Sequence, residues 1–125
     1  NYPNSDKAFS GLGITYSKKN KTSNAMDAFS QALKLNAENK PSMSSLLALS
    51  YQSNQFDQVE LVMQQYLEIH PNNVDILLGL AGVHYKLNRF EEAQSTLSLL
   101  FKINPNHIDA NSLLCKIEAK IEKVF

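Results

Sequence analysis

Residues 72–107 read NNVDILLGLAGVHYKLNRFEEAQSTLSLLFKINPNH, and this stretch decides the fold because its two apolar helix patterns recur upstream at one fixed spacing. The first pattern and the second are separated by a short polar break, which is typical of a helical hairpin. Each step back along the chain is 34 residues, so the hairpin is predicted to repeat. The positions that keep this step are Leu80, Asn88 and Leu97, then Leu46, Asn54 and Met63, then Leu12, Asn20 and Phe29.

Length and charge limit what the chain can be. Its 125 residues, 14.0 kDa and 43% hydrophobic residues suit one ordinary folded domain. Twelve basic residues balance twelve acidic ones, and the formal net charge is zero. Because nucleic-acid binding leaves a basic footprint, the sequence predicts no nucleic-acid partner.

The cellular compartment is left open by the sequence. Cys115 is the only cysteine, so no internal disulfide can form and a reducing compartment is permitted. No apolar run reaches the roughly 20 residues of a membrane span. The chain does not begin with Met, and we expect it to be a fragment of a longer protein. The cytoplasm is the default assignment, and an exported or membrane-anchored full-length protein fits as well.

The repeat borders follow from the turn residues. Each second helix is expected to stop at a proline or its substitute, at Ala37, Pro71 and Pro105, because proline cannot continue the helical hydrogen-bond ladder. The pairs Asn72-Asn73 and Asn106-His107 suit the turn and the N-cap of the next helix. We therefore predict the tail of a preceding repeat at 1–5, repeats at 6–39, 40–73 and 74–107, and a further helix over 108–125.

The last helix is predicted to run from Ile108 to about Val124. Leu113, Leu114, Ile117, Ile121 and Val124 lie on one face of it, and Lys116, Lys120 and Lys123 lie mostly off that face. Such a helix can close the open end of a stack. It can equally be the first helix of a truncated fourth repeat, and the sequence supports both interpretations.

At Leu12-Gly13-x-x-Tyr16, followed by Ala25, Phe29 and Ala32, the sequence resembles the tetratricopeptide repeat (TPR) family. The resemblance covers nearly the whole chain. It implies an all-α fold, a right-handed superhelix of helical hairpins (an α-solenoid) with three TPR-like repeats plus a C-terminal helix, about seven helices in all. It also implies a concave groove lined mainly by the first helix of each repeat. Small residues such as Gly13, Ala25 and Ala32 should let neighbouring helices approach, while Phe29 and its counterparts should fill the space between successive hairpins.

The second repeat is irregular, because its three small-residue positions hold Leu47, Val59 and Tyr66. One alternative is a slip of the first helix by one residue, which would place Tyr51 and Tyr85 in the core. We prefer the unslipped register, since it keeps the asparagines of the turns aligned without a gap. In that register both tyrosines face the groove.

Catalytic, metal and cofactor sites are not predicted. His70 and His107 are expected at turns and His84 is expected as a packed, half-core residue, without a carboxylate to orient it. Cys115 takes a small-residue position in the last helix, where we expect a buried thiol. Gly11-Leu12-Gly13 lacks the third glycine and the preceding strand of a phosphate loop. We therefore expect a protein that is not an enzyme.

Two short surface motifs have ordinary explanations. Lys18, Lys19 and Lys21 form a basic cluster at the first turn, which we interpret as a solvated turn because no further cations or aromatic residues continue it. Asn20-Lys21-Thr22 matches a glycosylation acceptor, which matters only if the protein is secreted.

The groove implied by the TPR resemblance is the candidate binding site for another protein. Its small centre and its tyrosines suit an extended peptide or a helix. Ile14 and Leu78 could equally be ordinary packing residues. The predicted groove residues are Lys7, Ser10, Ile14, Ser17 and Lys18, then Ser44, Ala48, Tyr51 and Gln52, then Asp75, Leu78, Gly82, Tyr85 and Lys86.

One partner class of the TPR family is disfavoured. TPR proteins that hold the acidic C-terminus of heat-shock chaperones use a carboxylate clamp of Lys, Asn, Asn, Lys and Arg. None of the matching residues here fits, and an aspartate among them would repel a carboxylate. The matching positions are Ser10, Ile14, Ser45, Asp75 and Gly79.

The sequence thus predicts a non-enzymatic interaction scaffold that binds a peptide segment or a helix of a partner protein. Two alternatives stay open. The chain could be a self-assembly module that stacks into oligomers, or the targeting arm of a larger enzyme whose catalytic domain lies elsewhere.

Overall fold

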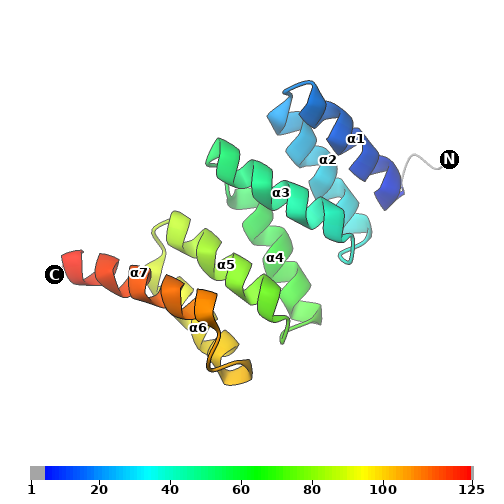
Figure 1. Ribbon diagram of the computed structural model, residues 1–125. Coiled ribbons are helices and arrows are strands. Elements are labelled where there is room, and N and C mark those ends of the chain that lie inside the picture. Colours follow the sequence, from blue (N-terminus) through cyan, green and yellow to red (C-terminus); the bar gives the residue numbers. More distant parts are fainter. Residues whose placement is uncertain (1–4, 125) are drawn as a thin grey trace. The chain divides into compact units, whose positions relative to one another are not determined.

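The computed structural model describes residues 5–124 of the chain, which form seven α-helices and no strand (Figure 1). The prediction of an all-α fold with about seven helices is therefore confirmed. None of the helices in this described part is both long and apolar enough to cross a lipid bilayer. The helices are α1 (Asp6–Lys18), α2 (Thr22–Leu35), α3 (Lys40–Ser53), α4 (Asp57–Ile69), α5 (Val74–Lys86), α6 (Phe90–Ile103) and α7 (Ile108–Val124).

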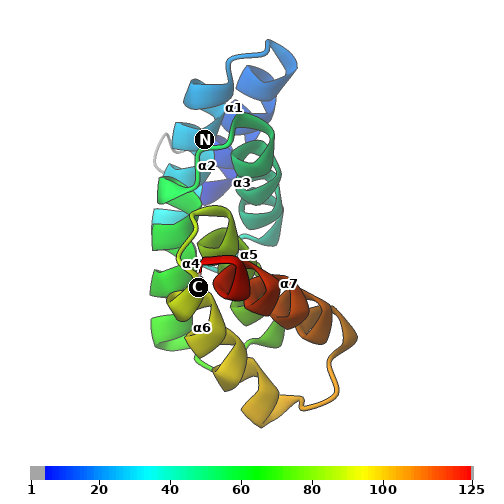
Figure 2. The same cartoon turned by 90° about the vertical axis from the view of Figure 1, so that its left-hand side faces the viewer.

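The helices pack into two compact units, Asn1–Val62 and Met63–Phe125. In the first unit, α2 packs against both α1 and α3. In the second unit, α6 packs against α5 and α7, and α7 also touches α5. Figure 2 shows α7 beside these two helices. Of the predicted repeat tail at 1–5, residues 1–4 lie outside the described part of the chain.

The first helix of each hairpin and α7 begin with the same kind of cap. The side chain at the N-cap accepts a hydrogen bond from the backbone N–H three residues later, which satisfies one of the unpaired donors of the first turn. The caps of α5 and α7 fall on the predicted residues Asn73 and His107. The cap bonds are Ala8 N to Ser5 Oγ, Ser42 N to Asn39 Oδ1 and Ile76 N to Asn73 Oδ1, each 3.0 Å, and Ala110 N to His107 Nδ1, 3.1 Å.

The turns inside the hairpins share one backbone conformation. Asn20, Asn54 and Asn88 have φ of 62°, 58° and 62°, and they are the non-glycine residues with positive φ in the described chain. Asparagine is one of the few residues that tolerate this left-handed region. In each turn the next residue donates its N–H to the carbonyl five residues back: Lys21 to Tyr16 (2.9 Å), Gln55 to Ser50 (3.1 Å) and Arg89 to His84 (2.8 Å). The same local bonding therefore recurs at every 34-residue step.

This recurrence agrees with the unslipped register. Ser50 and His84, which align with Tyr16, are 0% and 2% exposed, whereas Tyr51 is 43% exposed. The Ser50 hydroxyl donates to the Leu46 carbonyl oxygen at 2.7 Å, so this small polar residue is satisfied inside the fold. A slipped register would have buried the tyrosine in its place.

Close helix packing in the first unit depends on glycine. A Cβ atom on Gly13 of α1 would lie 2.7 Å from the ring carbons Cε1 and Cζ of Phe29 on α2. Phe29 is buried, as are Ala25 and Ala32 on the same helix. This contact of the Phe29 ring lies within the first hairpin, whereas the sequence predicted that Phe29 fills the space between successive hairpins. In the irregular repeat, Val59 and Tyr66 are also buried.

The second unit has one apolar core shared by α5, α6 and α7. Leu113, Leu114 and Ile121 of α7 pack against it. These residues and Ile117 confirm the predicted apolar face of α7, while the Val124 side chain lies outside the described part. The fully buried members of the core are Leu77, Ala81, Ala93, Leu97, Leu100, Ala110 and Ile117.

Cys115 corrects one sequence-based expectation, because its thiol is exposed and not buried. It lies at the position equivalent to Gly13 and Ala81. Those residues are covered by the second helix of their own hairpin, whereas no helix follows α7 in the described chain. The neighbouring positions Asn111 and Glu118 are exposed too, although their equivalents Leu77 and His84 are buried on α5.

Candidate functional site

The predicted groove residues of the first unit lie on one face of α1 and one face of α3. Their spacing of three or four residues places them on a single side of each helix. All are exposed or half-buried, so each can contact a partner. Ile14 is 46% exposed. Ile14 is therefore a surface residue and not a buried packing residue.

Tyr51 is the largest side chain on this surface. Its ring meets the buried ring of Phe56 edge-on, with centroids 5.1 Å apart and an interplanar angle of 82°. Such an edge-to-face pair holds the tyrosine ring in place. Partial burial raises the pKa of the Tyr51 hydroxyl above its ordinary value, because burial disfavours the charged form. The tyrosine thus presents a partly covered aromatic ring one helical turn from the small residue Ala48.

The second unit repeats this arrangement on α5. The ring centroids of Tyr85 and Phe90 are 5.9 Å apart, with an interplanar angle of 59°. Tyr85 and Leu78 are half-buried and pack partly against the apolar core. Leu78 thus differs from Ile14, because Leu78 is partly buried against the apolar core of its unit. Asp75, Gly82 and Lys86 complete the predicted set on this helix, each at least partly exposed.

The aromatic pairs follow the repeat. Tyr51 with Phe56 and Tyr85 with Phe90 are one 34-residue step apart, while the first repeat has Ser17 and Thr22 at these positions. The first repeat therefore lacks the aromatic pair.

Helix α7 carries exposed residues at positions equivalent to the predicted groove residues of α5, and the sequence prediction did not include them. Leu78, Gly82, Tyr85 and Lys86 of α5 each have an equivalent on α7, 34 residues later in the chain. All four equivalents are exposed, and α7 touches α5. The same 34-residue step would have found them if the last helix had been treated as a first helix. They are Ser112, Lys116, Ala119 and Lys120.

His84 has a neighbour that the sequence did not predict. Its Nδ1 atom lies 3.8 Å from Oε2 of Glu92, on the second helix of the same hairpin. The histidine is fully buried and the glutamate is exposed. The two residues are eight positions apart, so only the turn between α5 and α6 brings them together. The pair is a structural contact of the hairpin.

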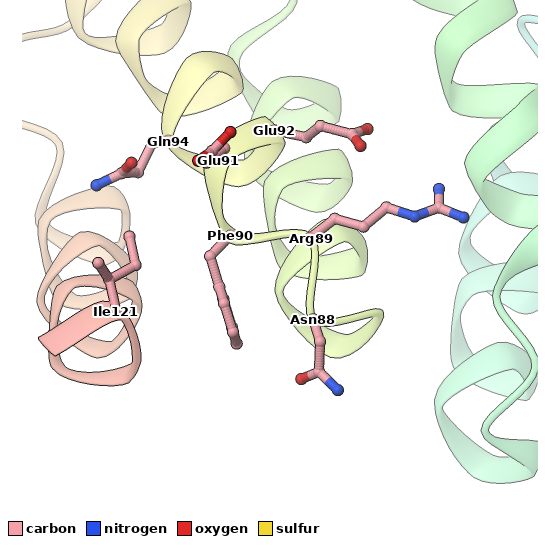
Figure 3. A pocket seen from close by; sticks show the side chains of 7 residues that line it. All are labelled: Asn88, Arg89, Phe90, Glu91, Glu92, Gln94 and Ile121. Atoms are coloured by element: carbon pink, nitrogen blue, oxygen red, sulfur yellow. The ribbon is translucent and has the colours of Figure 1, made fainter. Parts of the chain in front are cut away.

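A pocket of about 480 Å³ lies between the start of α6 and the second half of α7 (Figure 3). Figure 3 shows Ile121 and Gln94 on one side of it and Phe90 on the other. Arg89 and Glu92 point away from Ile121. Phe90 and Ile121 are thus its apolar lining residues, and the other five lining residues are polar or charged. The lining residues are Asn88, Arg89, Phe90, Glu91, Glu92, Gln94 and Ile121.

The fold and this surface define a helical-repeat protein, and comparison with known sequences specifies the family. A tetratricopeptide repeat profile matches residues 50–117, more than half of the chain, and a second one matches residues 7–39. The chain belongs to the tetratricopeptide repeat family. A search of curated proteins found no significant match.

Solved structures show the same fold at low sequence identity. The first TPR domain of human RPAP3 has a TM-score of 0.71 and 16% identity, over 98% of this chain and 96% of that one. The first TPR of Spaghetti (RPAP3) bound to the HSP90 peptide SRMEEVD gives 0.69 and 16%, over 94% and 93%. The second TPR domain of human RPAP3 in complex with the HSP70 peptide SGPTIEEVD gives 0.67 and 13%, over 90% and 98%.

Proposed function

We propose that this chain is a protein–protein interaction scaffold that binds a peptide segment or a helix of a partner on the exposed face of its first helices. The observation that carries the proposal is the exposed face of α3 and α5. On each, a tyrosine held by a buried or half-buried phenylalanine stands beside a small residue. Such a face leaves room for a backbone and offers an aromatic contact for an apolar side chain.

The partner is proposed to differ from the chaperone peptides bound by the similar structures. At the five clamp positions the chain has two serines, Ile14, Asp75 and Gly79 in place of cations and amides. Asp75 is exposed and would repel a carboxylate, and a Cβ atom on Gly79 would already lie 3.0 Å from Cε of Met63. The peptide SRMEEVD is therefore expected not to bind.

We also propose that the repeats divide as 6–39, 40–73 and 74–107, and that α7 is a polar cap. The starts of α1, α3, α5 and α7 are 34 residues apart. The flank of α7 that would face a further helix carries Asn111, Cys115 and Glu118, all exposed. A polar outer flank is what keeps the end of a repeat array in water.

Selection of a random peptide library displayed on phage tests the proposal without a known partner. Peptides enriched on the wild-type protein should lose most of their binding to Ala48→Arg and to Tyr85→Ala. They should keep it on Leu99→Glu, a matched control at an exposed position of the second helix α6. Circular dichroism confirms that each variant is folded. If the enriched peptides bound all four proteins alike, the proposed surface would be wrong.

A further inference from the structure

Helix α7 carries most of its positive charge on one side and its glutamates on the other. Lys116, Lys120 and Lys123 are four and three residues apart, so they form one stripe along the helix. These three residues are the lysine stripe. Glu118 and Glu122 are also four residues apart, and the period of 3.6 residues per turn places them on the opposite side. All five side chains are exposed.

This separation of charge is unfavourable for the helix itself. Residues three or four apart on a helix are neighbours, and like charges there destabilise it, whereas opposite charges stabilise it. Within residues 108–125, no acidic residue stands three or four positions before or after any member of the lysine stripe. The helix dipole accounts for Lys123 in the last turn, but Lys116 and Lys120 precede that turn. The lysine stripe therefore points to a role outside the helix.

The lysine stripe lies on the side of α7 that corresponds to the predicted groove. Lys116 and Lys120 are one 34-residue step beyond Gly82 and Lys86 of α5. Figure 1 shows α5 and α7 running in the same direction, and the two helices touch. Lys86 is exposed although α6 follows α5, so the exposure of Lys120 does not require an open end of the array.

The acidic residues on this side stand at the beginning of the two helices. Asp75 and Asp109 are the second residues of α5 and α7, one 34-residue step apart, and both are exposed. The side is thus negative where the helices begin and positive from the middle of α7 to its end. Lys86 adds a further positive charge at the end of α5. An acidic ligand is therefore attracted to one end of this surface and repelled from the other.

We propose that the lysine stripe binds an acidic segment of a partner protein through internal Asp or Glu side chains, without a free C-terminus. The inference rests on the proposed function, because it names the chemistry of the partner which that function requires. The stripe is one residue wide and about 10 Å long at 1.5 Å per residue, which suits a single chain segment. Nucleic acid needs a broader basic surface, and Glu118 and Glu122 on the same helix would repel it.

Phage selection on two versions of the chain, followed by binding of one synthetic peptide, tests the proposal. Peptides enriched on the wild-type chain should contain more Asp and Glu than those enriched on the triple variant Lys116→Gln, Lys120→Gln and Lys123→Gln. The most enriched acidic peptide is then made with an amidated C-terminus and a fluorescent label. It should bind the triple variant about tenfold more weakly than the wild type at low salt. Its affinity for the wild type should fall as salt screens the charges.

The double variant Glu118→Gln and Glu122→Gln is the matched control, because it alters charge on the opposite side of α7. It should bind the same peptide equally well or more tightly. The triple variant should melt at an unchanged or higher temperature, since like charges are removed from neighbouring positions. Weaker binding would then not reflect a loss of fold.

Several outcomes would overturn the proposal. They are an equal Asp and Glu content in the two sets of peptides, an unchanged affinity of the triple variant, and a loss of binding when the C-terminus is amidated. Tighter binding of a DNA duplex than of the peptide would also overturn it. The proposed function fails separately: a loss of binding in the lysine variant without a loss in Tyr85→Ala would refute only the tyrosine face.

Discussion

Gly13 and Phe29 lie so close that the ring leaves no space for a side chain at the glycine. A Cβ atom there would stand 2.7 Å from two ring carbons, and the ring belongs to a fully buried residue that cannot swing into solvent. The distance between α1 and α2 is thus set by the missing Cβ atom. The sequence predicted a close approach of helices at Gly13, and the structure shows that the Phe29 ring is the group that lies against it.

Gly13→Ala is expected to destabilise the protein by about 1–3 kcal/mol, since overpacking forces the ring or the helices to move. Gly11→Ala is the matched control on the same helix, where a Cβ atom meets nothing. It should stabilise the protein by about 0.5–1 kcal/mol through helix propensity alone. Urea unfolding followed by circular dichroism measures both values. Equal effects of the two substitutions would contradict the packing argument.

Asn88→Ala is expected to lower the stability by about 1 kcal/mol, because alanine tolerates the left-handed conformation poorly. Asn88→Gly should be neutral or slightly stabilising, since glycine adopts a φ of 62° without a steric cost. The same ordering is expected at Asn20 and Asn54. Thermal unfolding of the six variants checks it, and an alanine variant as stable as its glycine partner would show that the turn can relax.

Ser42 and Ser50 are both fully buried on α3, yet only one of them has its hydroxyl satisfied. Ser50 donates to Leu46, whereas the Ser42 hydroxyl has no partner in the part of the chain that the structure describes. Both gain equally in helix propensity when changed to alanine. Ser42→Ala should therefore be the more stable variant by about 1 kcal/mol. Chemical denaturation resolves this difference, and the reverse order would refute it.

Asp6 makes stability depend on pH in the acid range. The side-chain amides of Asn36 and Asn39 donate to its Oδ2 atom at 3.2 and 2.9 Å. These bonds favour the charged form and hold the pKa of Asp6 below its ordinary value of 3.8. Because the folded-state pKa is the lower one, the contribution is fully present above pH 3.8 and is lost as the pH falls through the folded-state value.

The advantage of the wild-type protein over Asp6→Asn should accordingly be constant near neutral pH and should shrink below pH 3.8. Unfolding midpoints in urea, measured at several pH values, give this comparison. A difference between the two proteins that stays the same down to pH 2 would rule out the carboxylate as its source, and would point to the shape of the side chain.

Much of the local structure could be predicted from the sequence because it depends on neighbours along the chain. The caps at Asn73 and His107 need only a side-chain acceptor ahead of a helix, and the turns need only an asparagine that accepts positive φ. The exposed position of Tyr51 followed from the same register. The groove itself remains a prediction, and the exposed α7 residues at the equivalent positions were not included in it.

Taken alone, the sequence determined the family, the seven helices and the 34-residue step, because periodicity and turn chemistry act over short distances. The tertiary structure decided which equivalent positions are covered. In the structure Cys115 and Gly11 are exposed, and His84 is buried beside Glu92. Ile14 is exposed, whereas its fellow groove candidate Leu78 is half-buried. These outcomes differ among similar residues because burial depends on which helix lies over a face, and that is settled only when the helices pack.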